Sequence, residues 1–307
     1  MSYDAVLLIA FGGPEKMADV RPFLANVLKG RPIPSQRLEE VVQHYEAFHG
    51  RSPLNEVTFR QACALRALLG REGPRLPVYV GMRNWQPYLH ETLAHMTADG
   101  VMRALGFILS AQQSEAGWER YKENVAAARA QVGAQAPEVE YTSGWYEHPL
   151  FIEAVTDLTK QAFTAVPVER RPQTPLVFTA HSVPVAMPGT AMYVQQIETG
   201  ARLVAERLGH ARWLIAYQSR SGDPRTPWLE PDISAVLRQL AGKDVREAVV
   251  VPIGFVCDHI EVLYDLDTEA KKIAAAHGLT MLRARTVNDH PIFIRMMADV
   301  VRRAMTV

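Results

Sequence analysis

Short apolar runs alternate along the chain with longer segments of helical pattern. The runs are typical of strands buried on both faces, as in a parallel sheet covered by helices. The intervening segments 57–69, 118–131 and 192–208 place apolar residues at helical spacing between charged ones. This alternation predicts an α/β fold. The expected strands lie at 5–11, 78–82, 104–110, 138–141, 176–180, 213–217, 248–253 and 280–282.

The two halves of the sequence resemble each other. Residues 7–14 and 176–184 are both an apolar run that ends shortly before a proline. Residues 101–111 are matched in the same way by residues 245–255, and a helical pattern follows each. We therefore predict two similar Rossmann-like lobes, each with a four-stranded parallel sheet flanked by helices.

The boundary between the lobes is expected near Trp145–Leu150. We predict an N-terminal lobe at residues 1–148, a C-terminal lobe at 149–290, and a last helix at 291–307 that packs back on the first lobe. In sheets of this kind ligands bind beyond the carboxyl ends of the strands. For two lobes that rule predicts an active-site cleft between them.

Composition excludes several classes of protein. Lys and Arg together number 33, as do Asp and Glu, so the chain lacks the basic excess that nucleic-acid binding calls for. The only cysteines, Cys63 and Cys257, are far apart, which excludes a disulfide framework and a Cys-rich metal site. The apolar run at 5–11 is too short for a signal peptide or a membrane span. We expect a cytoplasmic monomer without a transmembrane segment.

His181 and Ser182 directly follow the expected strand at 176–180. The end of a strand is where a site in an α/β protein is expected. A histidine there could act as a general base, because its pKa lies near neutrality. A purely structural histidine fits the same position equally well.

An acidic row follows the expected strand at 248–253: Glu261, Asp265 and Glu269 recur every four residues. On a helix this spacing aligns the three carboxylates on one face. The apolar residues Leu263, Leu266, Ala270 and Ile273 are expected largely on another. Like charges at this spacing destabilise a helix by about 0.2–0.5 kcal/mol per pair. The row is either a solvated face near a helix N-terminus or a series of oxygen ligands that passes a divalent cation or protons.

At these two segments the chain resembles the ferrochelatase family. Residues 180–184 (AHSVP) are similar to the family's catalytic-histidine motif, and residues 251–265 (VPIGFVCDHIEVLYD) to its catalytic-glutamate motif. Further matches follow in the family's order at 11–14, 49–54, 81–87, 217–219, 227–231 and 288–293.

The resemblance implies a lyase of haem biosynthesis that inserts Fe2+ into a porphyrin and releases two protons. Coproporphyrin III is the favoured substrate and protoporphyrin IX the second choice, with coprohaem or haem as the product. His181 and Glu261 would be catalytic and would contact the metal, together with Asp265 and Glu269 of the acidic path. Which of the first two contacts iron first stays open. The positions expected to bind or adjoin the porphyrin are Phe11, Lys29, Arg31, Ser52, Arg83, Gln112, Ser114, Tyr121, Ser182 and Trp228.

Some positions depart from the family pattern. Trp118 stands where some relatives have a cysteine of a [2Fe–2S] cluster, and the chain ends at Val307 without a cysteine tail. We therefore expect no iron–sulfur cluster and no permanently bound cofactor, with Fe2+ as substrate. Phe11 replaces a tyrosine of several relatives, and Gln112 replaces a histidine of others. The motif style is most similar to the bacterial coproporphyrin ferrochelatases.

Two other functions stay open. A cobalt or nickel chelatase for another tetrapyrrole would share the fold, but such enzymes favour extra histidines, and the glutamate motif contains only His259. A non-catalytic cytoplasmic protein that binds haem or porphyrin would need the pocket but not the base or the acidic row. Lys29 and Arg31 fit ordinary surface charges as well as partners of the porphyrin carboxylates.

Overall fold

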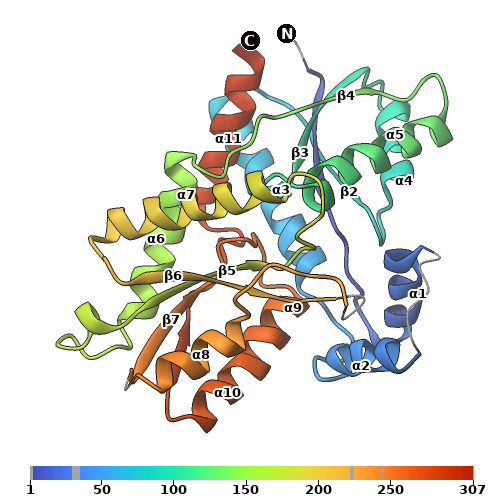
Figure 1. Ribbon diagram of the computed structural model, residues 1–307. Helices are drawn as coiled ribbons and strands as arrows, with labels where there is room; N and C mark the ends of the chain where they lie inside the picture. The colour runs from blue at the N-terminus through green and yellow to red at the C-terminus, as the bar shows by residue number, and fades with distance from the viewer. Residues whose placement is uncertain (1–2, 30–34, 222–224, 244, 307) are drawn as a thin grey trace. The chain divides into compact units, whose positions relative to one another are not determined.

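The computed structural model describes most of the chain, and its residues form two compact units (Figure 1). The second unit consists of Trp145–Asn288 together with the short segment Ala111–Glu115, and the first unit contains the remainder, including the last helix. The described residues are 3–29, 35–221, 225–243 and 245–306.

The first unit is built on a four-stranded parallel sheet in the order β2-β1-β3-β4. Its elements are β1 (Ala5–Ala10), α1 (Met17–Leu28), α2 (Ser35–Glu46), α3 (Leu54–Glu72), β2 (Val78–Met82), α4 (Leu89–Ala98), β3 (Arg103–Ile108), the π-helix η1 (Glu115–Glu119), α5 (Arg120–Val132), β4 (Glu138–Tyr141) and α11 (Pro291–Thr306).

Strand β1 is buried over its whole length because helices cover both faces of the sheet. Ala5, Leu7 and Ile9 pack in one cluster with apolar residues of α4 and α5. Helix α11 packs against α3, and Arg302 Nε donates to the Gly73 carbonyl at 2.9 Å. The last helix is therefore part of the first unit.

The second unit has a sheet with the same arrangement, in the order β6-β5-β7-β8. Its elements are α6 (Pro149–Phe163), the 3-10 turn η2 (Arg171–Gln173), β5 (Leu176–His181), α7 (Thr190–Leu208), β6 (Trp213–Gln218), α8 (Ile233–Ala241), β7 (Glu247–Val251), α9 (Ile260–Val262), the π-helix η3 (Leu263–Ala270), α10 (Lys271–Ala276) and β8 (Thr280–Arg283).

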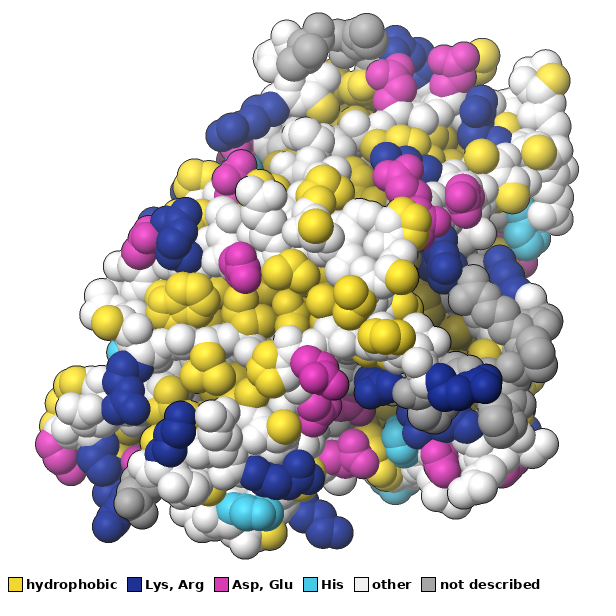
Figure 2. Space-filling view, viewed as in Figure 1, with side chains coloured by type: hydrophobic (Ala, Val, Ile, Leu, Met, Phe, Trp, Pro, Cys, Tyr) yellow, Lys and Arg dark blue, Asp and Glu magenta, His cyan; other side chains and the backbone are white. Residues whose placement is uncertain are grey.

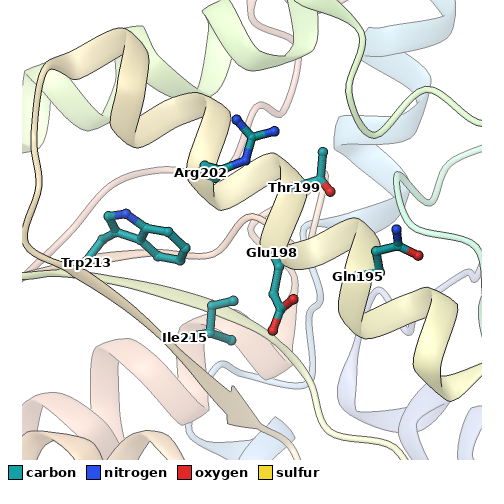
Figure 3. A pocket seen from close by; sticks show the side chains of 6 residues that line it. All are labelled: Gln195, Glu198, Thr199, Arg202, Trp213 and Ile215. Carbon is teal, nitrogen blue, oxygen red and sulfur yellow. The ribbon is translucent and has the colours of Figure 1, made fainter.

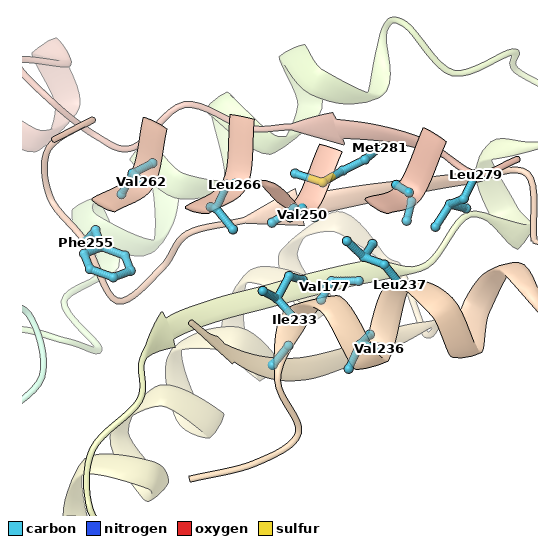
Figure 4. Packing of buried hydrophobic residues seen from close by; sticks show 14 residues of the cluster. Val177, Ile233, Val236, Leu237, Val250, Phe255, Val262, Leu266, Leu279 and Met281 are labelled. Atoms are coloured by element: carbon cyan, nitrogen blue, oxygen red, sulfur yellow. The ribbon is translucent and has the colours of Figure 1, made fainter. Parts of the chain in front are cut away.

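The core of the second unit contains side chains of α8 and of the segment α9–η3–α10 (Figure 4). Val177 and Val250 of the sheet pack there with Leu237 of α8 and with Val262 and Leu266. Helices α6 and α7 also contact the sheet and each other. This packing fixes the helix that carries the acidic row against the sheet.

The predicted pair of four-stranded parallel sheets is confirmed, with all eight expected strands present in the described residues. Strand β7 ends at Val251, two residues earlier than expected. The cause is Pro252, which has no N–H for the ladder, and a tight turn follows, in which the Ile253 N–H donates to the Val251 carbonyl at 2.8 Å.

Part of the acidic-row helix is a π-helix, whereas the sequence predicted a plain helix. A second π-helix, η1, occupies the corresponding place after β3, and all of its residues except Glu115 belong to the first unit. Such segments are rare and frequently occur at functional sites. The similarity of the halves therefore extends to an uncommon local geometry.

Charged side chains of both signs are interspersed on the face drawn in Figure 2. Among the described residues, no helix is long and apolar enough to cross a membrane.

Candidate active site

The carboxyl edge of the second sheet brings together the ends of β5 and β6. His181, the last residue of β5, is the register partner of Gln218, the last residue of β6. The Ser182 N–H donates to the Gln218 carbonyl at 2.8 Å. Two polar dipeptides, 181–182 and 218–219, therefore lie side by side at this edge.

The His181 imidazole is half-buried, and its Nδ1 is bonded to the Ser182 carbonyl. A carbonyl oxygen only accepts hydrogen bonds, so Nδ1 carries the proton in this contact. In the neutral ring, the lone pair is then on Nε2. The His181 carbonyl accepts a hydrogen bond from the Tyr193 hydroxyl at 3.0 Å. These contacts hold a base whose free nitrogen is Nε2.

The loop after β7 runs directly against β5. Gly254 N–H donates to the Thr179 carbonyl at 3.0 Å, and a Cβ at position 254 would lie 2.6 Å from Ala180 Cβ and 2.7 Å from its Cα. Only glycine permits this approach without displacing backbone. This close approach places the loop that leads to Glu261 against Ala180, the residue that precedes His181.

His259 begins the short helix that carries Glu261. Its Nδ1 accepts the Glu261 N–H at 3.2 Å, which satisfies an otherwise free backbone donor at the helix start. Burial lowers the pKa of His259, against the opposing effect of the Glu261 charge. His259 is therefore neutral and acts as a cap.

Asp265 is the most buried carboxylate of the acidic row. Its carboxylate accepts a hydrogen bond from the Ser219 hydroxyl. The pKa of Asp265 is raised to about 7, chiefly by burial and also by the charges of Glu261 and Glu269, against the lowering effect of the Ser219 hydrogen bond. Asp265 can therefore exchange a proton near neutral pH.

The row has an exposed face and a buried face. Glu261 and Glu269 are exposed, whereas Val262, Leu266 and Ala270 are buried. Leu263 and Ile273, which were expected on the apolar face together with Leu266 and Ala270, are half-buried. Within the described ranges, no three His, Cys, Asp or Glu side chains converge closely enough to hold a metal ion.

Trp228 is attached to the loop that follows His181. Ser182 Oγ donates to the Leu229 carbonyl at 3.0 Å, the Leu229 N–H donates to the Val183 carbonyl at 2.9 Å, and Trp228 forms a β-bridge with Pro184. Ser182 thus holds the Trp228 segment in place.

Gln112 and Ser114 are buried in the segment Ala111–Glu115 of the second unit. Gln112 Nε2 donates to the Ile253 carbonyl at 3.3 Å. The neighbouring Gln113 N–H donates to Gln196 Oε1 at 2.6 Å. Gln112 is therefore bonded to the loop that leads to Glu261.

The first unit brings three of the expected porphyrin residues together. The Arg83 guanidinium lies 5.8 Å from the ring centre of Phe11 and 5.0 Å from that of Tyr121. Backbone bonds of 3.0 Å from Arg83 N to the Ala10 carbonyl and from Asn84 N to the Phe11 carbonyl join the ends of β1 and β2. The result is a cation held by aromatic side chains.

The remaining expected residues have other surroundings. Ser52 is buried, and its N–H donates to the Pro14 carbonyl at 2.9 Å just before α3. Lys29 is exposed and ends α1 in the left-handed conformation. Arg31 lies outside the described residues.

Gln218 and Ser219 are polar neighbours of the site that the sequence did not single out as site residues. Gln218 is buried, and its Nε2 donates to the Glu261 carbonyl at 3.3 Å. The sequence feature that could have identified them is their position directly after the expected strand at 213–217, which matches the position of His181 and Ser182 after the strand at 176–180.

Comparison with known proteins decides the family. The ferrochelatase family model matches residues 3–305. The chain belongs to the ferrochelatase family. It is 43% identical over 304 residues to the coproporphyrin III ferrochelatase of Mycolicibacterium smegmatis, covering 98% of this chain and 89% of the relative. It is 45% identical over 310 residues to that of Nocardia farcinica (98% and 88% covered), and 42% over 304 residues to the ferrochelatase of Rhodopirellula baltica (99% and 86%).

Solved structures share the fold of this ferrochelatase-family chain. SirB from Bacillus subtilis with Fe3+ superposes with a TM-score of 0.61 at 12% identity, covering 99% of this chain and 96% of that one. CbiX, described as the terminal enzyme of sirohaem biosynthesis in denitrifying bacteria, has a TM-score of 0.56 at 14% identity (98% and 99% covered). At this identity the likeness shows the fold alone.

A hollow of about 470 Å³ lies elsewhere on the second unit, between α7 and the edge strand β6 (Figure 3). Trp213 and Ile215 come from β6, and Glu198 and Arg202 from α7. Trp213 begins β6, at the opposite end of the strand from Gln218. None of the expected site residues lines this hollow.

The raised pKa of Asp265 predicts a pH-dependent effect of Asp265→Asn on stability. A folded-state pKa above the ordinary value favours folding at low pH, and this contribution is lost as pH rises through about 7. The variant should therefore gain stability relative to the wild type as pH rises, by about 2–3 kcal/mol between pH 5 and pH 8. Urea unfolding at both pH values measures this, with exposed Glu198→Gln as the control. Equal differences at the two pH values would show that burial of the charge is not the cause.

Proposed function

We propose that this chain inserts Fe2+ into coproporphyrin III, forming coprohaem and releasing two protons, as a lyase of haem biosynthesis. The observation that carries this proposal is the sheet edge of the second unit. There a histidine with a free Nε2 is accompanied by a carboxylate row in which Asp265 titrates near neutrality.

The residues match the chemistry of metal insertion. A porphyrin must lose two N–H protons as the ion enters, so a base and a route for protons are both required. His181 Nε2 accepts a proton from a pyrrole nitrogen, and an imidazole is suited to this at neutral pH. Glu261 and the carboxylates behind it take up protons or lead the cation in, because hard oxygen ligands bind divalent cations and shed them.

The Phe11–Arg83–Tyr121 cluster of the first unit contains side chains of the kind that binding a large anionic macrocycle requires. Aromatic side chains bury its apolar surface. A guanidinium such as that of Arg83 has a planar shape suited to bonding a carboxylate. Coproporphyrin III has more propionates than protoporphyrin IX, and curated relatives 43–45% identical to this chain are named for coproporphyrin III.

Anaerobic assays with purified protein test this function. Fe2+, Co2+ and Ni2+ are each offered with coproporphyrin III, protoporphyrin IX and sirohydrochlorin, and the products are identified by absorption and mass. We expect the highest kcat/KM for Fe2+ with coproporphyrin III. A preference for protoporphyrin IX would overturn the substrate assignment, and a preference for sirohydrochlorin would overturn the function. Binding without insertion would indicate a porphyrin carrier.

A further inference from the structure

Arg283, at the end of β8, joins two carboxylates through one guanidinium. Its Nε and Nη2 donate to the two carboxylate oxygens of Asp267, each at 2.7 Å. Its Nη1 donates to Asp258 Oδ1, also at 2.7 Å. The side chain of Arg283 is only 12% exposed, and that of Asp258 14%. The guanidinium and Asp258 are thus largely shielded from water, whereas the Asp267 side chain is 34% exposed. Hydrogen bonds between charged groups are stronger than those between neutral groups.

One of the two carboxylates precedes the acidic row in the chain, and the other lies within it. Asp258 lies in the loop three residues before Glu261, and Asp267 lies in η3 between Asp265 and Glu269. In the described part of the chain, the side-chain hydrogen bonds of Arg283 go to Asp258, Asp267 and the Ala284 carbonyl. Arg283 therefore joins the loop before α9 to the π-helix η3 through Asp258 and Asp267.

Asn288 and Thr286 complete the attachment of the loop. Asn288 Nδ2 donates to Asp258 Oδ2 at 2.7 Å, and the Asp258 N–H donates to Asn288 Oδ1 at 2.9 Å. The Thr286 N–H donates to Asp258 Oδ1 at 3.2 Å. Both oxygens of Asp258 are thus bonded, so the loop has little freedom to shift while Arg283 holds it.

An ion pair elsewhere in the unit provides a comparison. Arg170 Nη2 lies 2.6 Å from Glu247 Oε1 at the start of β7, and the Glu247 side chain is 11% exposed. That pair joins the amino end of a strand to a turn. Glu247 is about as buried as Asp258, but the Arg170 side chain is 41% exposed, and the hydrogen bonds and ion pairs of this pair in the described part of the chain do not reach the acidic row.

We propose that Arg283 is a positioning residue for metal insertion: by joining Asp258 to Asp267 it fixes the loop and the π-helix to each other. Glu261, Asp265 and Glu269 then keep their places along the row. The role rests on the proposed function. A planar fork is required, because a lysine ammonium keeps the charge but cannot bond one carboxylate at two points and a second one at the same time.

Arg283→Lys and Arg283→Gln test the role in the full-length protein. A shift of about 1 Å in a catalytic group costs on the order of a hundredfold in rate. We therefore expect kcat for Fe2+ insertion to fall about tenfold in the lysine variant and about a hundredfold in the glutamine variant, with KM for coproporphyrin III nearly unchanged. Arg170→Gln is the matched control, expected to lose stability while keeping kcat.

Hydrogen exchange supplies a second readout that does not depend on activity. Amides of residues 258–270 should exchange faster in both Arg283 variants and at the wild-type rate in Arg170→Gln. An equal loss of kcat in Arg170→Gln would assign the effect to stability and overturn the role, as would wild-type kcat and exchange in Arg283→Lys. A wild-type chain that inserts no metal would overturn the proposed function itself, and the role with it.

Discussion

Replacing His181 by alanine is expected to lower kcat for Fe2+ insertion by at least about a hundredfold, the usual contribution of a general base. The affinity for coproporphyrin III should stay close to that of the wild type. Anaerobic insertion assays and quenching of porphyrin fluorescence measure the two quantities separately.

The expected loss follows from the position of the ring. His181 ends β5, its Nδ1 bonds the Ser182 carbonyl, and its Nε2 is left as the acceptor. Alanine removes this acceptor and leaves the strand and the Tyr193 contact to the backbone carbonyl intact. The fold should therefore survive, and the loss should lie in the proton-transfer step.

His210→Ala is a suitable control for this substitution. His210 is also half-buried in the second unit, and its Nε2 lies 2.8 Å from the Thr174 carbonyl. Loss of that bond removes the same kind of contact near the amino ends of β5 and β6, at the opposite edge of the sheet from His181. Wild-type kcat in His181→Ala, or an equal loss in His210→Ala, would refute the assigned role.

Glu261→Gln is expected to lower kcat by about a hundredfold as well, because glutamine keeps the shape but neither accepts a proton nor attracts a cation. Glu261 is exposed, so the free energy of unfolding should change by no more than about 0.5 kcal/mol. The His259 cap bonds the backbone N–H of residue 261 and is preserved. Steady-state kinetics and urea unfolding check the two expectations.

Two other carboxylates serve as comparisons for Glu261. Glu269→Gln, at the far end of the row, should lower kcat less, since Glu269 lies two helical turns from Glu261. Glu198→Gln, on α7 in the hollow of Figure 3, should leave kcat unchanged. Equal losses in all three variants would indicate a general effect of negative charge and contradict a specific role for Glu261.

The sheets were predictable from sequence because their strands are buried on both faces. Apolar runs such as 176–180 have no other stable place than between two layers of helices, and the observed β5 differs from the prediction by one residue. The end of β7 was misplaced because the apolar pattern continues through Ile253. A pattern of apolar residues gives no information on backbone hydrogen bonding, and Pro252 has no N–H to donate to the sheet.

The candidate site was predictable in its principal residues but not in their surroundings. His181 and Glu261 stood out through strand ends, spacing and family motifs, and their roles stay predictions for the experiments above. The π-helical geometry of η3 was not predicted. Spacing of four residues aligns side chains on either kind of helix, so the pattern does not distinguish them.

The sequence by itself determined local features: where most strands end, which residue types follow them, and the four-residue spacing of the acidic row. The tertiary structure decided the contacts between distant segments. Ser219 and Asp265, which bond each other, are 46 residues apart, and Arg283 lies 25 residues from Asp258 and 16 from Asp267. The pKa of Asp265 and the attachment of the row depend on burial and on these partners. The burial and the partners both arise when β6, β8 and η3 pack together, so no local sequence pattern predicts them.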